Sequence, residues 1–255
     1  MKIGVIGLGL IGGSIFKELS LNVEYELVGI SRTLKAKNVY TDYNNLKDCD
    51  LVFVCTPINA TLEILDALND LLPETTIVTD VCSLKNFVSN KEYKYNFIPS
   101  HPMAGTEKSG WENSFVGLFK GAKWAITPIG GNITPAQDAL EKIIKELGAE
   151  PVVTSPEEHD RAVALISHFP LVVAQALCEN IKDNKLAQLL VSTGFKDTTR
   201  LALSNIEMAT DMVDFNRKNI VEALKLFEKN INEILNDDYK LKATELKDFR
   251  ANLYN

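Results

Sequence analysis

Residues 2–12 read KIGVIGLGLIG, from Lys2 to Gly12, and the expected class of fold follows from them. The run Lys2–Ile6 is typical of a buried strand, and the next six residues form the pattern G-x-G-x-x-G. Apolar residues then recur at helical spacing, at Ile11, Ile15 and Leu19. A strand, this glycine pattern and a helix in succession are typical of a turn that binds a dinucleotide.

Each glycine of the pattern has its own expected role. Gly7 permits a tight turn, Gly9 lets a pyrophosphate approach the backbone, and Gly12 lets the helix pack closely on the strand. The unpaired N–H groups of the following helical turn, at Leu10 and Ile11, suit phosphate oxygens. A glycine-rich turn without a ligand is the alternative, but the position between a strand and a helix favours the dinucleotide.

Strands and helices alternate beyond this turn. We expect strands over 25–30, 38–40, 51–55, 76–79, 95–98, 123–127 and 151–154, with helices over 58–72 and 135–147. This alternation predicts an α/β fold with a Rossmann-type, doubly wound, mainly parallel sheet. Carboxyl ends of parallel strands meet at one edge, so we expect Cys55-Thr56-Pro57, Asp80–Lys85 and His101 beside the glycine turn.

The residues after the second expected strand bear on the choice of cofactor. An Asp or Glu at this point favours NAD, whereas this chain has Ser31, Arg32 and Thr33, with Lys35 and Lys37 close behind. A guanidinium and hydroxyls suit a 2′-phosphate, so we expect NADP in preference to NAD. The alternative is that Arg32 stacks on the adenine, in which case NAD is also accepted.

The second half of the chain contains no convincing strand. We expect helices over 156–181, 184–193, 205–236 and 239–253, the first opened by a capping box between Ser155 and Glu158. The predicted domains are therefore 1–154, which binds the dinucleotide, and 155–255, which is all-α. Long apolar stripes on such helices often form a dimer, and a self-contained helical subdomain is the alternative.

Composition restricts the partners. The 255 residues carry a formal net charge of −7, which argues against nucleic acid or an anionic membrane as the main partner. We expect no apolar stretch close to the ~20 residues of a membrane span. The four cysteines form no C-x-x-C pair, so neither a disulfide framework nor a metal site is expected, and the cytoplasm is the default location.

The three histidines differ in their surroundings. His101 lies in IPSHPMAGTEKSG (98–110), a turn-rich loop expected after a strand, and a neutral imidazole can accept a hydroxyl proton near neutral pH. His168 precedes Pro170, which should loosen its helix and admit a ligand. His159 stands among acidic residues in a first helical turn, where we expect a solvated face.

A second polar cluster spans Gly194–Arg200. Lys196 and Arg200 are four residues apart, so on a helix they would share a face and could bind an anionic substrate. A solvated cluster of charges is the alternative.

Together these motifs resemble the prephenate/arogenate (cyclohexadienyl) dehydrogenases of tyrosine biosynthesis, over essentially the whole chain. The matching segments are Gly7–Gly12, Cys55–Pro57, Thr79–Lys85, His101–Gly110, Ser167–Pro170 and Gly194–Arg200. The glycine pattern is generic, but H-P-M-A-G-T-E-K-S-G followed by G-F-K-D-x-T-R is specific.

The resemblance implies a reaction and roles for individual residues. Prephenate would give 4-hydroxyphenylpyruvate, or L-arogenate would give L-tyrosine, by oxidative decarboxylation with hydride transfer to NAD(P)+. His101 would take the proton of the substrate's 4-hydroxyl, and Ser83 would bond to both. Arg200 would bind a substrate carboxylate, supported by His168, Thr106 and Lys196. The implied cofactor contacts are Gly7, Gly9, Leu10, Ile11, Gly12, Ser31, Arg32, Thr33, Cys55, Thr56, Pro57, Asp80 and Ser83.

The resemblance also implies a homodimer through the helical domain and L-tyrosine as a feedback ligand, which would act at the active site. The substrate stays open, because Ser204–Thr210 lacks an aromatic residue that some relatives have there. Two other functions remain as alternatives. A β-hydroxyacid-type dehydrogenase needs a catalytic lysine with a glycine-rich lead-in, which we do not find. A non-catalytic dinucleotide sensor gives no reason for His101, Ser83 and Arg200 to occur together.

Overall fold

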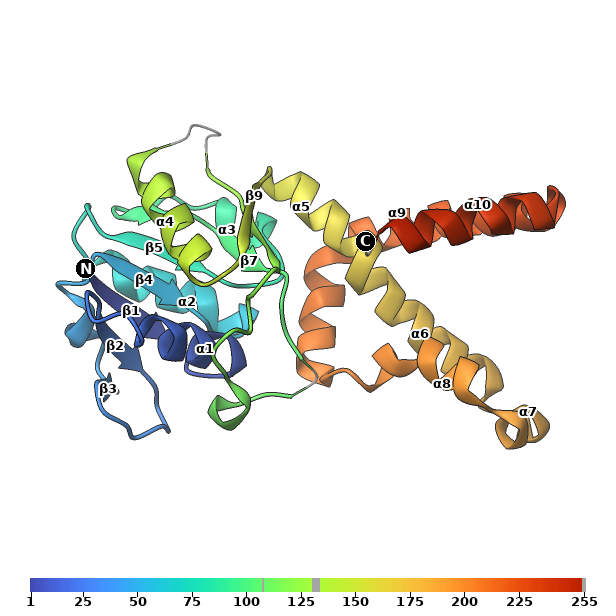
Figure 1. Cartoon of the computed structure of the whole chain (residues 1–255), viewed down its shortest axis with the longest axis horizontal. Coiled ribbons are helices and arrows are strands. Elements are labelled where there is room, and N and C mark those ends of the chain that lie inside the picture. The colour runs from blue at the N-terminus through green and yellow to red at the C-terminus, as the bar shows by residue number, and fades with distance from the viewer. Residues whose placement is uncertain (107, 130–133, 254–255) are drawn as a thin grey trace. The chain divides into compact units, whose positions relative to one another are not determined.

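The structure is a computed structural model that describes residues 1–106, 108–129 and 134–253 (Figure 1). The chain forms two compact units. The first consists of Met1–Val163 with Leu203–Phe215, and the second of Ala164–Ala202 with Asn216–Asn255.

The first unit is built on a six-stranded parallel sheet in the order β3-β2-β1-β4-β5-β6. Its strands are β1 (Lys2–Ile6), β2 (Glu26–Ile30), β3 (Val39–Tyr40), β4 (Leu51–Val54), β5 (Ile77–Asp80) and β6 (Asn96–Phe97). This is the strand order of a doubly wound Rossmann sheet, in which the winding reverses between β1 and β4. The predicted fold class is confirmed.

Helices cover both faces of this sheet. On one face, α1 (Leu10–Leu19) and α4 (Pro135–Glu146) pack in one apolar cluster with Ile3, Val5 and Phe53. On the other face, α2 (Ile58–Asn69) and α3 (Asn86–Ser89) pack with Val52 and Val54. Strand β4 is fully buried, as a central parallel strand is when helices cover both faces.

A second, three-stranded sheet holds β7 (Ser100–Pro102), β8 (Lys123–Ile126) and β9 (Glu150–Val153). Strand β7 is antiparallel to β8, and β8 is parallel to β9. The expected strand over 95–98 therefore ends at Phe97, and His101 lies within a strand opposite Ala125, not in a loop after one. The prolines explain this difference. Pro99 and Pro102 cannot donate ladder hydrogen bonds, but an edge strand such as β7 tolerates them.

The helices of the second half follow most of the predicted ranges, but the helix expected over 184–193 ends at Leu190, and the helix over Thr193–Thr198 was not predicted. They are α5 (Pro156–Val163), α6 (Phe169–Ile181), α7 (Lys185–Leu190), α8 (Thr193–Thr198), α9 (Ile206–Asn236) and α10 (Tyr239–Asn252). Short 3₁₀ turns lie at η1 (Tyr43–Leu46), η2 (Trp111–Asn113) and η4 (Arg200–Leu203).

Three local features distinguish the helices of this half. The capping box is confirmed, because Glu158 N–H donates to Ser155 Oγ (3.2 Å) and Ser155 N–H donates to Glu158 Oε2 (3.3 Å). A π-helical turn, η3 (Ala164–His168), lies just before Pro170, which confirms the predicted loosening. Helix α9 is kinked at Asn216, whose backbone is non-helical.

Among the described residues, one helical stretch, Pro156–Ile181, is long and apolar enough to cross a membrane by length and composition, with a mean hydropathy of 1.6. The expectation of no such stretch was wrong, because no charged residue stands between Arg161 and Glu179. Core helices of soluble proteins share these properties, so composition alone does not distinguish the two.

Candidate functional site

The turn after β1 has the geometry that its glycines predict. Gly7 has a positive φ of 85°, and a Cβ there would lie 2.4 Å from the carbonyl oxygen of Cys55. A Cβ on Gly12 would lie 2.1 Å from the Gly7 carbonyl oxygen. Only glycine fits at these two positions, so the tight turn and the close helix packing are confirmed. A Cβ on Gly9 would meet nothing within 4 Å, so the space beside this residue is open.

The N-terminus of α1 fits an anionic group. Gly9 is its N-cap and makes no side-chain cap, and the first turn contains no acidic residue. The N–H groups at Leu10 and Ile11 therefore lie at the positive end of the helix dipole with no competing carboxylate beside them. Together with the open space at Gly9, these groups fit the pyrophosphate of a dinucleotide.

The carboxyl ends of the parallel strands bring the other expected cofactor residues to the same edge of the first unit. Gly7 N–H donates to the carbonyl of Ile30 at 3.0 Å, and Cys55 N–H donates to that of Ile6 at 2.7 Å. Ser31 directly follows β2, and Cys55-Thr56-Pro57 follows β4. The expected position of Cys55-Thr56-Pro57 beside the glycine turn is confirmed.

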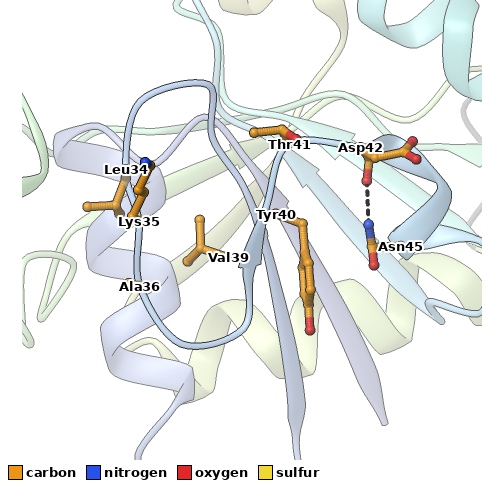
Figure 2. Close-up of a pocket in the computed structure, with 8 residues that line it drawn as sticks. All are labelled: Leu34, Lys35, Ala36, Val39, Tyr40, Thr41, Asp42 and Asn45. Atoms are coloured by element: carbon orange, nitrogen blue, oxygen red, sulfur yellow. Dashed lines mark hydrogen bonds between the residues drawn. The ribbon is translucent and has the colours of Figure 1, made fainter.

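The segment Ser31–Thr33 forms a compact turn at this edge. The Ser31 hydroxyl accepts hydrogen bonds from the backbone N–H groups of Thr33 (3.3 Å) and Leu34 (3.0 Å), and Arg32 and Thr33 are exposed. Beyond the turn, a cavity of about 370 Å³ lies beside β3 (Figure 2). Lys35 and Tyr40 are among its lining residues.

Two thiols lie close to this edge and are not nucleophiles. Burial raises the pKa of Cys82 to about 12, and the neighbouring Asp80 charge adds to the effect. Burial also holds the pKa of Cys55 well above its ordinary value, with Cys82 and Asp80 as further causes. Both side chains are therefore uncharged thiols near neutral pH. Because the thiolate and not the thiol is the nucleophile, neither cysteine is reactive.

Asp80, at the end of β5, is fully buried and has no exposed surface to offer a cofactor. Its Oδ2 pairs with the ammonium of Lys85 and accepts the N–H of Cys82 at 2.9 Å. Lys85 Nζ also donates to the carbonyl of Ser100 at 2.6 Å, and Ser100 N–H reaches Asp80 Oδ1 at 3.3 Å. The cofactor contact expected of Asp80 stays a prediction; in this structure its side chain fixes the loop after β5 and ties it to β7.

His101 follows Ser100 on β7 and is half-buried. Its Nδ1 lies 3.0 Å from Nε2 of His159, and Nδ1 of His159 lies 2.8 Å from Oδ1 of Asp160. The expected solvated position of His159 is wrong, because only 4% of it is exposed. A signal was present in the sequence: His159 and Asp160 precede Val163 by four and three residues, a spacing that places all three on the inward face of α5.

The other expected residues of the first unit lie in loops. Ser83 is half-buried between β5 and α3. Thr106 is exposed, and its hydroxyl accepts the N–H of Lys108 at 3.2 Å. Glu107, in the same matching segment, lies outside the described residues.

In the second unit, His168 is 1% exposed and stands at the end of the π-helical turn. Its Nδ1 lies 3.0 Å from Nδ2 of Asn216. Asn219 Nδ2 donates to Asn216 Oδ1 at 2.7 Å, so the Asn216 amide turns its donor toward His168. The Nδ1 of His168 is therefore an acceptor, and a neutral ring carries its proton on Nε2.

Lys196 and Arg200 are both exposed in the second unit. Lys196 lies in α8, which ends at Thr198, and Arg200 opens the 3₁₀ turn η4. They do not share one continuous helix face, because α8 ends at Thr198 and the backbone of Thr199 leaves the helical region (φ −96°, ψ 6°). Lys196 also lines a cavity of about 550 Å³ with Ile181, Gln188, Val191, Ser192 and Phe195.

Two family models match this chain. The nucleotide-binding domain of prephenate dehydrogenase matches residues 24–153, and the dimerization domain of prephenate dehydrogenase matches residues 155–247. The prephenate dehydrogenase of Lactococcus lactis is 30% identical over 254 residues, which cover 91% of this chain and 70% of that protein.

Two solved structures are similar over nearly the whole chain. The arogenate dehydrogenase of Synechocystis has a TM-score of 0.83 and 31% identity, and the match covers 99% of this chain and 97% of that one. The prephenate dehydrogenase of A. aeolicus in complex with hydroxyphenyl propionate and NAD+ has a TM-score of 0.83 and 26% identity, with 100% and 96% covered.

Proposed function

Because the chain belongs to the prephenate dehydrogenase family, it is an NAD(P)-dependent oxidoreductase, and we propose that it decarboxylates prephenate, L-arogenate or both as it oxidises them. The reaction belongs to tyrosine biosynthesis, where it gives 4-hydroxyphenylpyruvate from prephenate or L-tyrosine from L-arogenate. The observation that carries the proposal is the match of both halves of the chain to this family. His101 also supports the proposal, because it lies on strand β7 and its ring is held by the contact with His159.

The residues of the first unit hold the cofactor and move the proton. The glycine turn, the N-terminus of α1 and the segment Cys55–Pro57 hold the dinucleotide, which when bound accepts a hydride from C4 of the substrate. His101 takes the proton of the 4-hydroxyl, a step that a neutral imidazole performs near neutral pH. Ser83, in the loop anchored by Asp80 and Lys85, bonds to the same hydroxyl and keeps it in register with His101.

The residues of the second unit bind the substrate. The Arg200 guanidinium holds a substrate carboxylate, because a planar pair of N–H donors both attracts and orients that group. Lys196 adds positive charge, and His168, with its proton on Nε2, donates a hydrogen bond. Thr106 is a further proposed substrate contact. The proposed functional domains are 1–154, which binds the dinucleotide, and 155–255, which binds the substrate; these bounds differ from those of the two compact units.

NADP is the preferred cofactor in this proposal. Arg32 and Thr33 are exposed just after β2, where the adenosine ribose lies in this fold, and no carboxylate stands among Ser31–Thr33. Lys35 follows on the wall of the adjoining cavity and adds a second cation (Figure 2). These groups favour a 2′-phosphate over a ribose hydroxyl.

The helical unit forms a homodimer in this proposal. Several large apolar side chains of the second unit are more than half exposed, which is typical of an unpaired interface: Leu186, Leu189, Leu190, Leu235, Leu241 and Phe249. The name of the matching domain agrees with this assembly.

All four cysteines are free thiols, which suits the reducing cytoplasm. L-Tyrosine, which shares the product's ring and hydroxyl, is the proposed feedback ligand of the active site.

One steady-state assay tests the activity and both specificities. Absorbance at 340 nm is followed with NAD or NADP, each combined with prephenate or L-arogenate. We expect turnover with at least one substrate and a higher kcat/KM with NADP. Protein that binds NADP but turns over neither substrate would refute the dehydrogenase proposal and favour the dinucleotide sensor.

A further inference from the structure

Asp160 can act only as a hydrogen-bond acceptor in this structure. Backbone N–H groups donate to both of its oxygens, Lys85 N–H to Oδ1 at 2.8 Å and Asn86 N–H to Oδ2 at 2.9 Å. Its side chain is 3% exposed, so these donors fix the carboxylate in place. Oδ1 also lies 2.8 Å from His159 Nδ1, which must therefore carry a proton.

The proton on His159 Nδ1 determines how this ring meets His101. A neutral imidazole with a proton on Nδ1 has an unprotonated Nε2, which is an acceptor. His159 Nε2 lies 3.0 Å from His101 Nδ1, and the two rings meet edge to face at 75°. His101 must then be the donor in this contact, with its proton on Nδ1.

We infer that Asp160 and His159 fix the tautomer of His101, so that Nε2 of His101 accepts the hydroxyl proton of the substrate. The inference deepens the proposed function and rests on it for the role of His101. His159 and Asp160 are positioning residues: they act through the ring of His101 and not on the substrate. Without them, His101 could carry its proton on Nε2, and that nitrogen would then donate to the hydroxyl instead of accepting from it.

The proton balance of the step follows from this arrangement. The O–H bond of the 4-hydroxyl breaks, an N–H bond forms at His101 Nε2, and His101 becomes a cation. Its Nδ1–H still points to His159, so the Asp160 carboxylate stabilises the new charge through the intervening ring. Similar carboxylate–histidine pairs orient catalytic and metal-binding imidazoles in other enzymes.

The tautomer can be measured directly in the resting enzyme. Only three histidines are present, so a long-range ¹H–¹⁵N correlation spectrum of the ¹⁵N-histidine-labelled full chain separates their rings. We expect His101 and His159 to be protonated on Nδ1, with Nε2 unprotonated on both. A spectrum in which His101 carries its proton on Nε2 would overturn the inference.

Variants test whether the tautomer affects catalysis. Asp160→Asn and His159→Leu should each lower kcat about 10- to 100-fold, the usual effect of removing such an orienting partner, with little change in the KM for NADP. His159→Gln should recover much of the loss, because its amide oxygen can accept the proton of His101 Nδ1. Glu157→Gln removes a carboxylate from the exposed side of the same helix and should leave kcat unchanged.

Different results would refute the proposed function and the fixed tautomer of His101. Wild-type protein that turns over neither substrate would refute the proposed function, whereas the spectrum of the resting enzyme would still decide the tautomer. If His159→Leu does not fold, the inference is tested by the kcat of His159→Gln and by the wild-type spectrum. A folded His159→Leu variant with kcat within twofold of wild type would overturn the positioning role.

Discussion

The ammonium of Lys85 and the carboxylate of Asp80 form an ion pair in which neither side chain is exposed to solvent. Lys85 Nζ also donates to the Ser100 carbonyl, and Asp80 accepts backbone N–H groups from Cys82 and Ser100. Both charged groups therefore have hydrogen-bond partners as well as each other. If one of the two side chains loses its charge, the other charge stays buried without its counter-ion. The pair holds the loop of Ser83 and the strand of His101 in one arrangement.

We predict that Lys85→Met destabilises the protein by about 3–5 kcal/mol, the usual cost of leaving one buried charge unpaired. The double variant Asp80→Asn/Lys85→Met should lose less, because neither buried charge remains. Urea denaturation measures both values. Lys91→Met is the matched control: Lys91 pairs with Asp66 at the surface, and such pairs contribute about 0–1 kcal/mol. Equal losses at Lys85 and Lys91 would contradict the argument.

His101→Asn should lower kcat by about 10²–10⁴, the usual contribution of a positioned acid–base group, and leave the affinity for NADP intact. The amide fits the space of the ring but cannot take a proton near neutral pH. Steady-state kinetics and NADP titration followed by fluorescence measure the two quantities. Turnover that survives the substitution would remove His101 from the proton transfer.

Arg200→Gln should act mainly on KM for the substrate, because the guanidinium binds a carboxylate in both the ground state and the transition state. A hydrogen bond to a charged group contributes about 1.5–3 kcal/mol, which corresponds to an increase in KM of about 10- to 150-fold. Lys185→Gln removes an exposed cation from the same unit and serves as the control. An unchanged KM in Arg200→Gln would place the carboxylate clamp elsewhere.

Arg32→Ala should lower kcat/KM for NADP about tenfold and leave kcat/KM for NAD nearly unchanged, because only NADP carries the 2′-phosphate that the guanidinium binds. The ratio of the two values, measured with one substrate, isolates this contact from general damage. Equal losses with both cofactors would instead indicate that Arg32 stacks on the adenine.

The parallel sheet was predictable because its signals are local. The glycine pattern follows β1 directly, and each buried strand is a short apolar run that ends in polar or turn residues. The π-helical turn was also predictable, since Pro170 lacks the N–H that would bond four residues back. Both predictions depend on neighbours within a few positions in the sequence.

The contacts that build the site were harder to predict because they join distant residues. Asp80 was correctly placed at the end of a strand, but the sequence did not indicate that Lys85 turns back to neutralise it. His159 lies 58 residues from His101, and its acidic neighbours suggested solvent. The strand of His101 pairs with β8, and two prolines had made that stretch look like a loop.

The buried thiol of Cys82 makes the stability depend on alkaline pH. Burial raises its pKa from an ordinary 9.0 to about 12, so in the unfolded chain the thiol ionises first. The stability that this group contributes is complete below about pH 9 and is lost as the pH rises toward 12, at about 1.4 kcal/mol per pH unit. Under reducing conditions, wild type should lose stability between pH 9 and 10.5 by about 1.6 kcal/mol more than Cys82→Ala does. Urea denaturation at several pH values measures this difference, with Cys178→Ala, a half-buried thiol of the second unit, as the control. Parallel pH dependences in wild type and Cys82→Ala would show that the thiol ionises as readily in the folded protein as in the unfolded chain.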